Sequence, residues 1–190
     1  MESKLKYIHQ DLIEGCKQHD RSSQFKIYKL YYKAMFNTSL RILNDSAEAE
    51  DNMQESFLDA FRKIDHYSGE GTFGSWLKRI VVNNALDILR KKREQISIED
   101  AGLDFPDEGD QESEEEIQLQ VQEIKKAINQ LPEEYRIILS LYLLEGYDHE
   151  EISEILKISY NNSRTRYSRA RQKLLQIISH NKLTKEINYN

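Results

Sequence analysis

Cysteine, proline and glycine are all scarce in this chain of 190 residues, and each shortage narrows the choice of fold. The single cysteine, Cys16, excludes an intrachain disulfide framework. Two prolines and seven glycines leave few tight turns and favour long helices. Apolar residues make up only 38% of the chain but recur at helical spacing, which predicts an all-α globular protein rather than a disordered one.

Long apolar runs are missing as well. No stretch approaches the roughly 20 apolar residues that a membrane-spanning helix needs. The N-terminal residues also lack the apolar core of a signal peptide. We therefore expect a cytoplasmic protein without stable membrane insertion.

Enzyme signatures are absent too. The five histidines are scattered, without the spacing of a metal site or a catalytic triad: His9, His19, His66, His149 and His180. The glycine-containing loop 66–71 is not followed by Gly-Lys-Ser/Thr, which excludes a phosphate loop. We expect no catalytic residue, no metal site and no cofactor, so an enzyme is the least favoured alternative.

The charge is unevenly distributed. The net charge is -6, but residues 99–116 contain ten acidic and no basic residues, so the segments on either side are slightly basic. This block has no helical periodicity, and charge repulsion should keep it extended. The sequence thus predicts a flexible acidic linker over residues 95–116 between two small helical domains, 1–94 and 117–180, followed by a polar tail, 181–190. A solvated linker is favoured over mimicry of DNA by this block.

The stretch 146–173 predicts two short helices around a tight turn. Asp148 followed three residues later by Glu151 is typical of a capping box, where a helix begins. Lys157–Ile158 supplies the turn, and Ser159 is a good N-cap for the second helix.

The second helix of this pair has a distinctive surface. Its packing side is Ser163, Tyr167, Ala170, Leu174 and Ile177, and its opposite side is Asn161, Thr165, Ser168 and Gln172. Cations flank that polar stripe: Arg164 and Arg171 on one margin, Arg166, Arg169 and Lys173 on the other. No acidic residue lies between Ser159 and Lys173 to pair with them locally. This favours a helix that reads base edges in a DNA major groove over a merely solvated basic face.

The helix expected over 47–65 has two different faces. Its apolar face, Met53, Phe57, Ala60, Phe61 and Ile64, should pack inward. Acidic residues repeat on the other side, with Gln54 beside them: Glu48, Asp51, Glu55 and Asp59. Spacing alone favours a solvated acidic face over a docking surface for a basic partner.

A further helix is expected from a Thr72 cap to about Arg93. Its predicted inward side is Phe73, Trp76, Leu77, Ile80, Asn84 and Ile88. A second stripe consists of Arg79, Asn83, Leu86 and Arg90, and its polar members are suited to a DNA backbone. The basic run that ends the helix also fits a simpler interpretation, since cations are favourable at a helix C-terminus.

Other apolar residues are predicted to be core. In the first domain they lie on a long helix: Phe25, Tyr28, Tyr32, Met35 and Ile42. In the second domain they form one stripe of Ile117, Val121, Ile124 and Ile128, and another of Ile137, Ile138, Leu141, Tyr142 and Leu144.

Three stretches together resemble the sigma-70 family of bacterial RNA polymerase initiation factors, of the extracytoplasmic-function (ECF) type. Residues 45–57 resemble the polymerase-binding helix of the family, and residues 73–90 resemble its -10 element helix. Leu131-Pro132-Glu-Glu-Tyr-Arg136, leading into the helix-turn-helix, is similar to its -35 domain. The resemblance extends from about Ser22 to Leu175, in the order of the family.

The resemblance implies roles for particular residues. Contacts with core RNA polymerase fall to Asp51, Gln54 and Glu55, which reverses the interpretation from spacing alone. Contacts with the -10 element fall to Tyr67, Ser68, Gly69, Thr72, Arg79, Asn83 and Arg90, with a flipped base held by the 67–72 loop. Contacts with the -35 element fall to Asn161, Asn162, Arg164, Thr165, Arg166 and Arg169. An anti-sigma factor is the regulator that the family leads us to expect.

The chain departs from the family pattern at three places. Val82 stands where the family often has arginine, and Lys157 replaces the usual turn glycine. Asn161–Asn162 replaces a commoner acidic-glycine pair, which points to a distinct -35 sequence.

Two functional hypotheses remain. The first is a transcription initiation factor that binds core RNA polymerase, directs it to -35 and -10 promoter elements and opens the -10 region. The second is a stand-alone helix-turn-helix regulator with a helical sensor domain, a class that usually dimerises on a palindrome.

Overall fold

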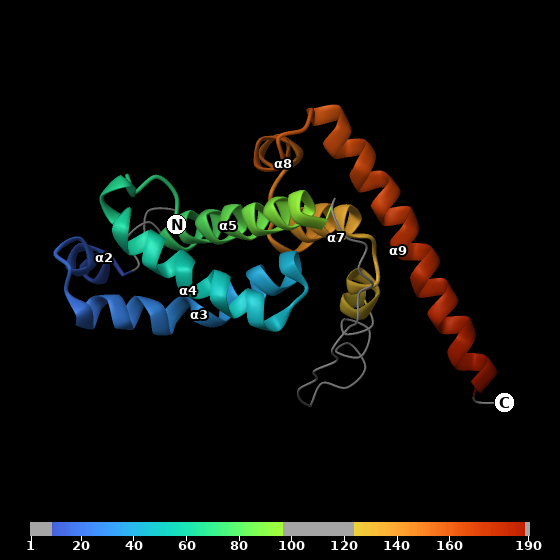
Figure 1. The fold of residues 1–190 in the computed structure, drawn as a ribbon, viewed down its shortest axis with the longest axis horizontal. Coiled ribbons are helices and arrows are strands. Elements are labelled where there is room, and N and C mark those ends of the chain that lie inside the picture. The colour runs from blue at the N-terminus through green and yellow to red at the C-terminus, as the bar shows by residue number, and fades with distance from the viewer. Residues whose placement is uncertain (1–8, 97–123, 189–190) are drawn as a thin grey trace, which may run out of the picture. The chain divides into compact units, whose positions relative to one another are not determined.

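The computed structural model of the chain describes residues 9–96 and 124–188. The chain divides into two compact units, Met1–Glu99 and Asp100–Asn190. Every regular element in the described ranges is a helix, and none is a strand, which confirms the predicted all-α fold with two helical domains (Figure 1). The predicted linker, 95–116, lies outside the described residues except for its first two, which end a helix.

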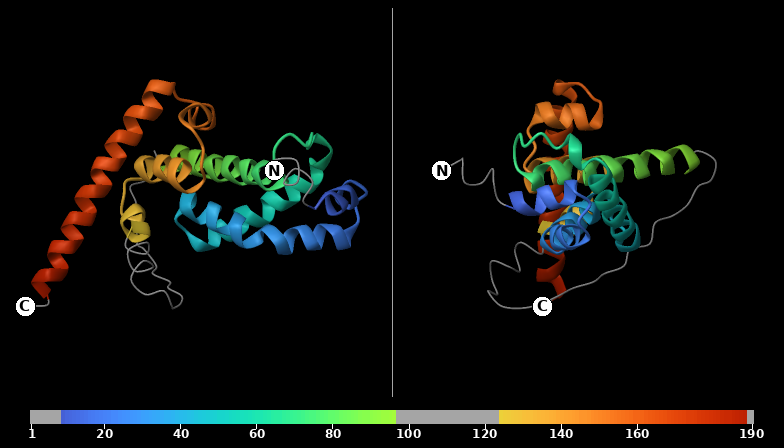
Figure 2. Two further views of the ribbon diagram at one scale, coloured as in Figure 1. Left: turned by 180° about the vertical axis from the view of Figure 1, so that it is seen from behind. Right: turned by 90° about the vertical axis from the view of Figure 1, so that its left-hand side faces the viewer.

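Unit 1 is a bundle of three long helices with a short one beside them. Its elements are α2 (Gln10–Lys17), α3 (Arg21–Leu43), α4 (Ser46–Arg62), the 3-10 helix η1 (Ile64–His66) and α5 (Phe73–Ile96). The helices α3, α4 and α5 pack against one another, and α2 packs against α3 and η1 (Figure 2).

Local side-chain caps explain where these helices begin. The Asp20 carboxylate accepts hydrogen bonds from the backbone N–H groups of Ser22 and Ser23 at the start of α3. Asn44 adopts a left-handed φ of 58° where α3 ends, and the Asp45 side chain then accepts from the N–H of Glu48 to start α4. Each cap satisfies a backbone donor that the first turn would otherwise leave unpaired.

A buried amide ties the three long helices together. Asn52 on α4 is 2% exposed, and its Nδ2 donates to the Ser39 hydroxyl of α3 at 2.6 Å and to the Val81 carbonyl of α5 at 3.2 Å. The buried apolar cluster of this unit includes Met35 of α3, Met53 and Phe57 of α4, and Leu77 and Val81 of α5. Because a buried polar group without partners costs about 1–3 kcal/mol, these bonds favour one arrangement of the three helices.

The face that α5 buries is wider than the predicted one. Phe73 and Leu77 are buried as predicted, whereas Trp76, Ile80, Asn84 and Ile88 are only half-buried. Five further positions are buried that were not predicted to be core: Val81, Val82, Ala85, Leu86 and Leu89. Leu86 therefore belongs to the core and not to the exposed basic stripe. The reason is that both α3 and α4 pack on α5, so a wide arc of its surface is covered.

Unit 2 is built around the predicted helix-turn-helix. Residues 124–129 are helical, followed by α7 (Glu133–Leu139), the π-helical turn η2 (Ser140–Leu144), α8 (His149–Leu156) and α9 (Tyr160–Asn188). The core includes Ile128, Leu131, Ile138, Leu139, Leu141, Ile152, Ala170 and Leu174. The helix α9 continues to Asn188 and so extends into the predicted polar tail, 181–190.

Two predicted core residues of unit 2 lie at the surface. Leu144 is 40% exposed and Ile124 is 43% exposed. For Leu144 the cause is the π-helical turn, in which the Glu145 N–H donates to the Ser140 carbonyl at 2.9 Å, five residues back. This wider turn changes the angular spacing of side chains, so an α-helical count points the last leucine to the wrong side. The predicted core residues Ile117 and Val121 lie outside the described part of the chain.

Candidate nucleic-acid interface

Both helices of the helix-turn-helix begin as the sequence predicts. The Asp148 carboxylate accepts from the N–H groups of Glu150 and Glu151, both at 2.8 Å, and the Glu151 carboxylate accepts from the N–H of Asp148 at 2.9 Å. This reciprocal pair is a complete capping box. The Ser159 hydroxyl accepts from the N–H of Asn162 at 3.2 Å and caps α9.

The turn between the two helices runs through a strained lysine. Lys157 has φ 55° and ψ 46°, the left-handed conformation that glycine adopts without penalty. A side chain there costs about 1–2 kcal/mol, and Lys157 is the residue that replaces glycine in the family pattern. The strained conformation lets the Ile158 N–H donate to the Ser153 carbonyl at 3.0 Å, so the last turn of α8 keeps its hydrogen bonds.

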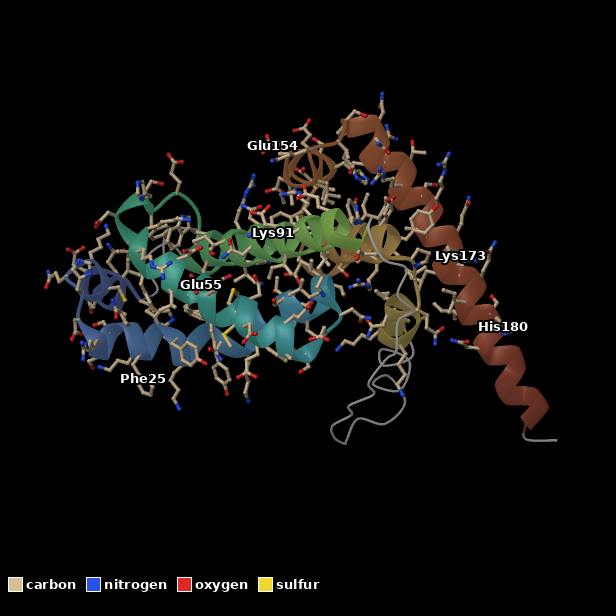
Figure 3. The ribbon with its side chains drawn as sticks, in the orientation of Figure 1. Phe25, Glu55, Lys91, Glu154, Lys173 and His180 are labelled. Atoms are coloured by element: carbon tan, nitrogen blue, oxygen red, sulfur yellow. The ribbon has the colours of Figure 1, made fainter. Side chains whose placement is uncertain are left out.

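The two sides of α9 differ in burial as predicted. Ser163 and Ala170 are fully buried, and Leu174 is 7% exposed. The opposite side is exposed and forms a shallow surface lined by Asn161, Arg164, Thr165, Ser168, Arg169 and Gln172. Lys173, on one margin of this surface, is exposed as well (Figure 3).

Two of the α9 arginines have partners, on α9 itself and on α7. Arg166 donates from Nε to the Asn162 side-chain oxygen at 3.1 Å, and its guanidinium lies 3.4 Å from the Glu134 carboxylate of α7. Arg164 lies over the ring of Tyr160 at 5.9 Å. The acidic partner of Arg166 therefore comes from another helix and not from α9.

His149 is a contact residue that the sequence analysis missed. Its Nδ1 lies 3.0 Å from the Ser163 hydroxyl, and its ring stacks on Tyr142 with centroids 4.7 Å apart. In the sequence it is one of five scattered histidines. Residue spacing could not predict its contacts, because the partners lie on η2 and α9.

The loop before α5 is held from inside by a tyrosine. Tyr67 is 7% exposed, its ring packs on Phe73 and Trp76 at 5.5 Å, and its hydroxyl donates to the Gly71 carbonyl at 3.1 Å. Burial raises the pKa of Tyr67 above its ordinary value, because the charged phenolate loses hydration there. Gly69 and Gly71 have φ of 80° and 74°, which favour glycine.

The outer side of the same loop is polar. Ser68 and Thr72 are exposed. The Thr72 hydroxyl accepts from the N–H of Ser75 at 3.1 Å, so Thr72 caps α5 as predicted. The loop therefore presents small polar side chains on a backbone fixed by Tyr67.

The basic stripe of α5 is partly paired within the unit. Asn83 is exposed, while Arg79 and Arg90 are half-buried. Arg90 lies 2.6 Å from the Asp87 carboxylate, and Lys92 pairs with Glu48 of α4. Part of the basic run at the end of α5 thus binds acidic groups of its own unit.

The predicted acidic face of α4 contains half-buried and exposed residues. Glu48 pairs with Lys92, and Asp59 lies near Arg62, Lys63 and the Asn84 amide, so both bind within the unit. Asp51, Gln54 and Glu55 are exposed, and Glu55 is labelled on α4 in Figure 3. Glu55 also has a partner within the unit, since Arg62 Nη1 lies 3.1 Å from its carboxylate. The docking role that the family resemblance implies for the three exposed residues stays a prediction.

An apolar groove lies beside this acidic face. It has a volume of about 420 Å³ and is lined by Arg21, Gln24, Phe25, Tyr28, Gln54, Phe57, Leu58 and Phe61, from α3 and α4. Phe25, which was predicted to be core, is 60% exposed at its edge, and Leu58 is 50% exposed (Figure 3). The helical spacing of Phe25 is correct for the core, but it lies near the start of α3, where the described helices do not cover it. Exposed large apolar side chains in a groove indicate an interaction site.

The described residues lack two other features. None of their helices is long and apolar enough to cross a bilayer. Within the same ranges, no three acidic, histidine or cysteine side chains gather closely enough to hold a metal ion.

Comparison with known families matches both units. Residues 27–95 match sigma-70 region 2, and residues 121–174 match sigma-70 region 4. The RNA polymerase sigma-H factor of Pseudomonas aeruginosa is 30% identical over 173 residues, which cover 86% of this chain and 90% of the relative. The ECF RNA polymerase sigma-E factor of Haemophilus influenzae is 31% identical over 173 residues, covering 86% of this chain and 91% of the relative.

The fold is also similar to that of solved sigma factors. The sigma factor RpoE, crystallised with the anti-sigma factor NepR from Bartonella quintana, superposes with a TM-score of 0.63 at 22% identity, over 81% of this chain and 95% of that one. Both regions are present in the family order, and curated relatives are similar over most of the length. The chain therefore belongs to the sigma-70 family of RNA polymerase sigma factors, of the ECF type, and acts in transcription initiation.

Proposed function

We propose that the chain binds core RNA polymerase through α4 and directs it to a two-part promoter through α5 and α9. The observation that carries this proposal is the division of exposed charge. An acidic face on α4 lies in the unit that matches region 2, and a cation-flanked polar stripe on α9 lies in the unit that matches region 4. Residues 1–94 and 117–180 would act as separate modules joined by the acidic linker, 95–116.

Docking to core polymerase is assigned to Asp51, Gln54 and Glu55. All three are exposed, and Gln54 also lines the apolar groove with Phe25 and Leu58. A partner surface that combines basic and apolar side chains would complement both features at once.

Contact with the -10 element is assigned to the outer side of the 67–72 loop and to α5. Ser68, Gly69 and Thr72 would receive a flipped base, whose extrusion costs a few kcal/mol that a shaped pocket offsets. Tyr67 is buried, so we assign it the support of the loop instead of stacking on the base. The single strand would then run along Arg79, Asn83 and Arg90.

Contact with the -35 element is assigned to α9. Asn161, Thr165 and Arg169 line its exposed surface and would face base edges and phosphates. Asn162 and Arg166 bond to each other, and Arg166 also pairs with Glu134, so we expect them to act as one unit at the margin. Arg164, over the Tyr160 ring, would reach the other margin.

The regulator and the location follow from the family. An anti-sigma factor that covers the exposed docking face of α4 would compete with core polymerase. We assign the chain to the cytoplasm because core polymerase and promoter DNA are found there. The similar RpoE structure is itself a complex with an anti-sigma factor.

Run-off transcription with purified core polymerase tests the proposal. We expect a promoter-specific product only when the chain is added, and we expect scrambling of either promoter element to reduce it. The stand-alone regulator hypothesis makes the opposite prediction, which is tight binding of the free chain to a palindrome without any specific transcript. That result would overturn the proposal.

A further inference from the structure

His149 lies where α8, η2 and α9 meet. It is the first residue of α8, directly after the Asp148 cap, and its ring is half-buried. Tyr142 of η2 stacks on it at 4.7 Å with an interplanar angle of 28°. Tyr160 and Tyr167 of α9 meet it edge to face, at 6.2 Å and 5.4 Å. The imidazole of one α8 residue thus contacts both η2 and α9.

A single polar contact joins this ring to α9. The Nδ1 atom of His149 lies 3.0 Å from the hydroxyl of Ser163, which is fully buried. Ser163 is in the first turn of α9, on the side opposite Asn161 and Thr165. A hydrogen bond is directional, so it restricts both the rotation of α9 about its axis and its translation along that axis.

A second route leads from His149 to an arginine at the edge of the DNA-facing side. The edge-to-face contact of His149 holds the Tyr160 ring, and the Arg164 guanidinium lies over the same ring at 5.9 Å. The direction of Arg164 therefore depends on a ring that His149 supports. Contacts between an arginine and an aromatic face are attractive at this distance.

We propose that His149 is a positioning residue for promoter recognition, which orients α9 through the Ser163 hydroxyl and supports Arg164 through Tyr160. This rests on the proposed -35 role of α9. His149 itself touches no base in this scheme. Its effect is on selectivity, because a base contact requires correct distance and angle at its polar atoms.

The expected size of the effect comes from base readout. A well-formed bidentate side-chain contact discriminates against the wrong base by about 5- to 150-fold. Loss of the His149–Ser163 bond lets α9 rotate, so several contacts weaken together. We expect the base preference at the -35 (upstream) element to fall at least fivefold and the base preference at the -10 (downstream) element to stay unchanged.

The test uses the full chain with core polymerase on a pool of promoters that are randomised in both elements. Each promoter is linked to its own downstream tag, and the tags are counted in the transcripts. His149→Ala and Ser163→Ala should each flatten the upstream preference, and the double variant should be no worse than either single one. His149→Asn, whose amide can reach the same hydroxyl, should recover most of it. His149→Phe keeps the ring but not the bond and should recover little. His180→Ala, further along α9, is the control.

The outcomes separate the two proposals. If the unaltered chain has no upstream preference, the -35 role of α9 fails and the positioning role fails with it. If the unaltered chain has a preference that His149→Ala and Ser163→Ala both retain, only the positioning role is overturned. Lower total transcription with unchanged base preference also overturns it, because that is what loss of folding alone would cause. Should His149→Ala unfold unit 2, Ser163→Ala, which removes one oxygen atom, decides the matter.

Discussion

Arg62 Nη1 lies 3.1 Å from the Glu55 carboxylate, so a residue assigned to polymerase docking already has a cation beside it on the same helix. Both side chains are more than half exposed, at 61% and 57%. An ion pair so exposed to solvent adds little to stability. Glu55 can therefore exchange this neighbour for a partner's cation at small cost, and the face remains available for docking.

Charge reversal on this face is the first prediction. We expect Asp51→Lys with Glu55→Lys to abolish co-purification with core polymerase, because two attractive contacts become repulsive. Helical content by circular dichroism should be unchanged, since both side chains are exposed. Reversal of the exposed acids Asp11 and Glu14 on α2 is the matched control and should leave binding intact. Unaltered binding of the α4 variant would count against the docking role.

Arginine removal on α9 is the second prediction. Arg164→Ala and Arg169→Ala should reduce initiation that depends on the -35 element. If each contacts one phosphate, the slope of log affinity against log salt should become shallower by about 1 per arginine. Lys125→Ala, another exposed cation of unit 2, serves as the control. The assignment is wrong if a promoter with a scrambled -35 element loses as much activity as the native promoter does.

The strained turn lysine gives the third prediction. Lys157→Gly removes a left-handed penalty of about 1–2 kcal/mol, which the greater entropy of glycine in the unfolded chain offsets by about 0.5–1 kcal/mol. The net expectation is a unit 2 that is more stable by up to about 1.5 kcal/mol, measured by urea unfolding. Lys157→Ala keeps the strain and should not gain stability. A glycine variant less stable than the alanine variant would contradict this account.

The tyrosine beneath the 67–72 loop gives the fourth prediction. Tyr67→Phe keeps the ring contacts with Phe73 and Trp76 and removes only the bond to the Gly71 carbonyl. We expect a loss of about 1 kcal/mol in the free energy of unfolding. We also expect slower promoter opening in a permanganate assay of unpaired thymines, while binding to core polymerase stays the same. Tyr135→Phe, in the other unit, is the control. Promoter opening at the normal rate by the Tyr67→Phe variant would contradict the role of Tyr67 in supporting the loop.

The pH dependence of unit 1 is the fifth prediction. Burial raises the pKa of Tyr67 and Tyr31, and it raises the pKa of the Cys16 thiol to about 11. A group whose pKa is raised on folding adds stability that is fully present below its unfolded pKa, about 10 for tyrosine and 8.5 for cysteine. Thermal melts should therefore show the stability falling as the pH rises through this alkaline range. Cys16 should react with a thiol reagent only in denaturant, and rapid labelling of the native chain would contradict its burial.

The sequence by itself determined the features that depend on neighbours within a few residues. The Asp148–Glu151 capping box, the Ser159 cap and the turn at Lys157 all form within one helical turn, and each was predicted. The sides of α9 were also predicted, because a helix with one apolar stripe has one way to pack. The family motifs belong to the same class, since their residues are adjacent in the chain.

Only the tertiary structure decided that α5 also buries Val82, Leu86 and Leu89, and that Phe25 and Leu144 lie at the surface. It also decided that Glu134 pairs with Arg166 and that His149 bonds to Ser163. The two contacts join side chains that are 32 and 14 residues apart in the chain. The exposure of the apolar residues depends on which helices cover which side of α3, α5 and η2. Periodicity describes one helix at a time, and the energy of such contacts exists only after the helices have packed together.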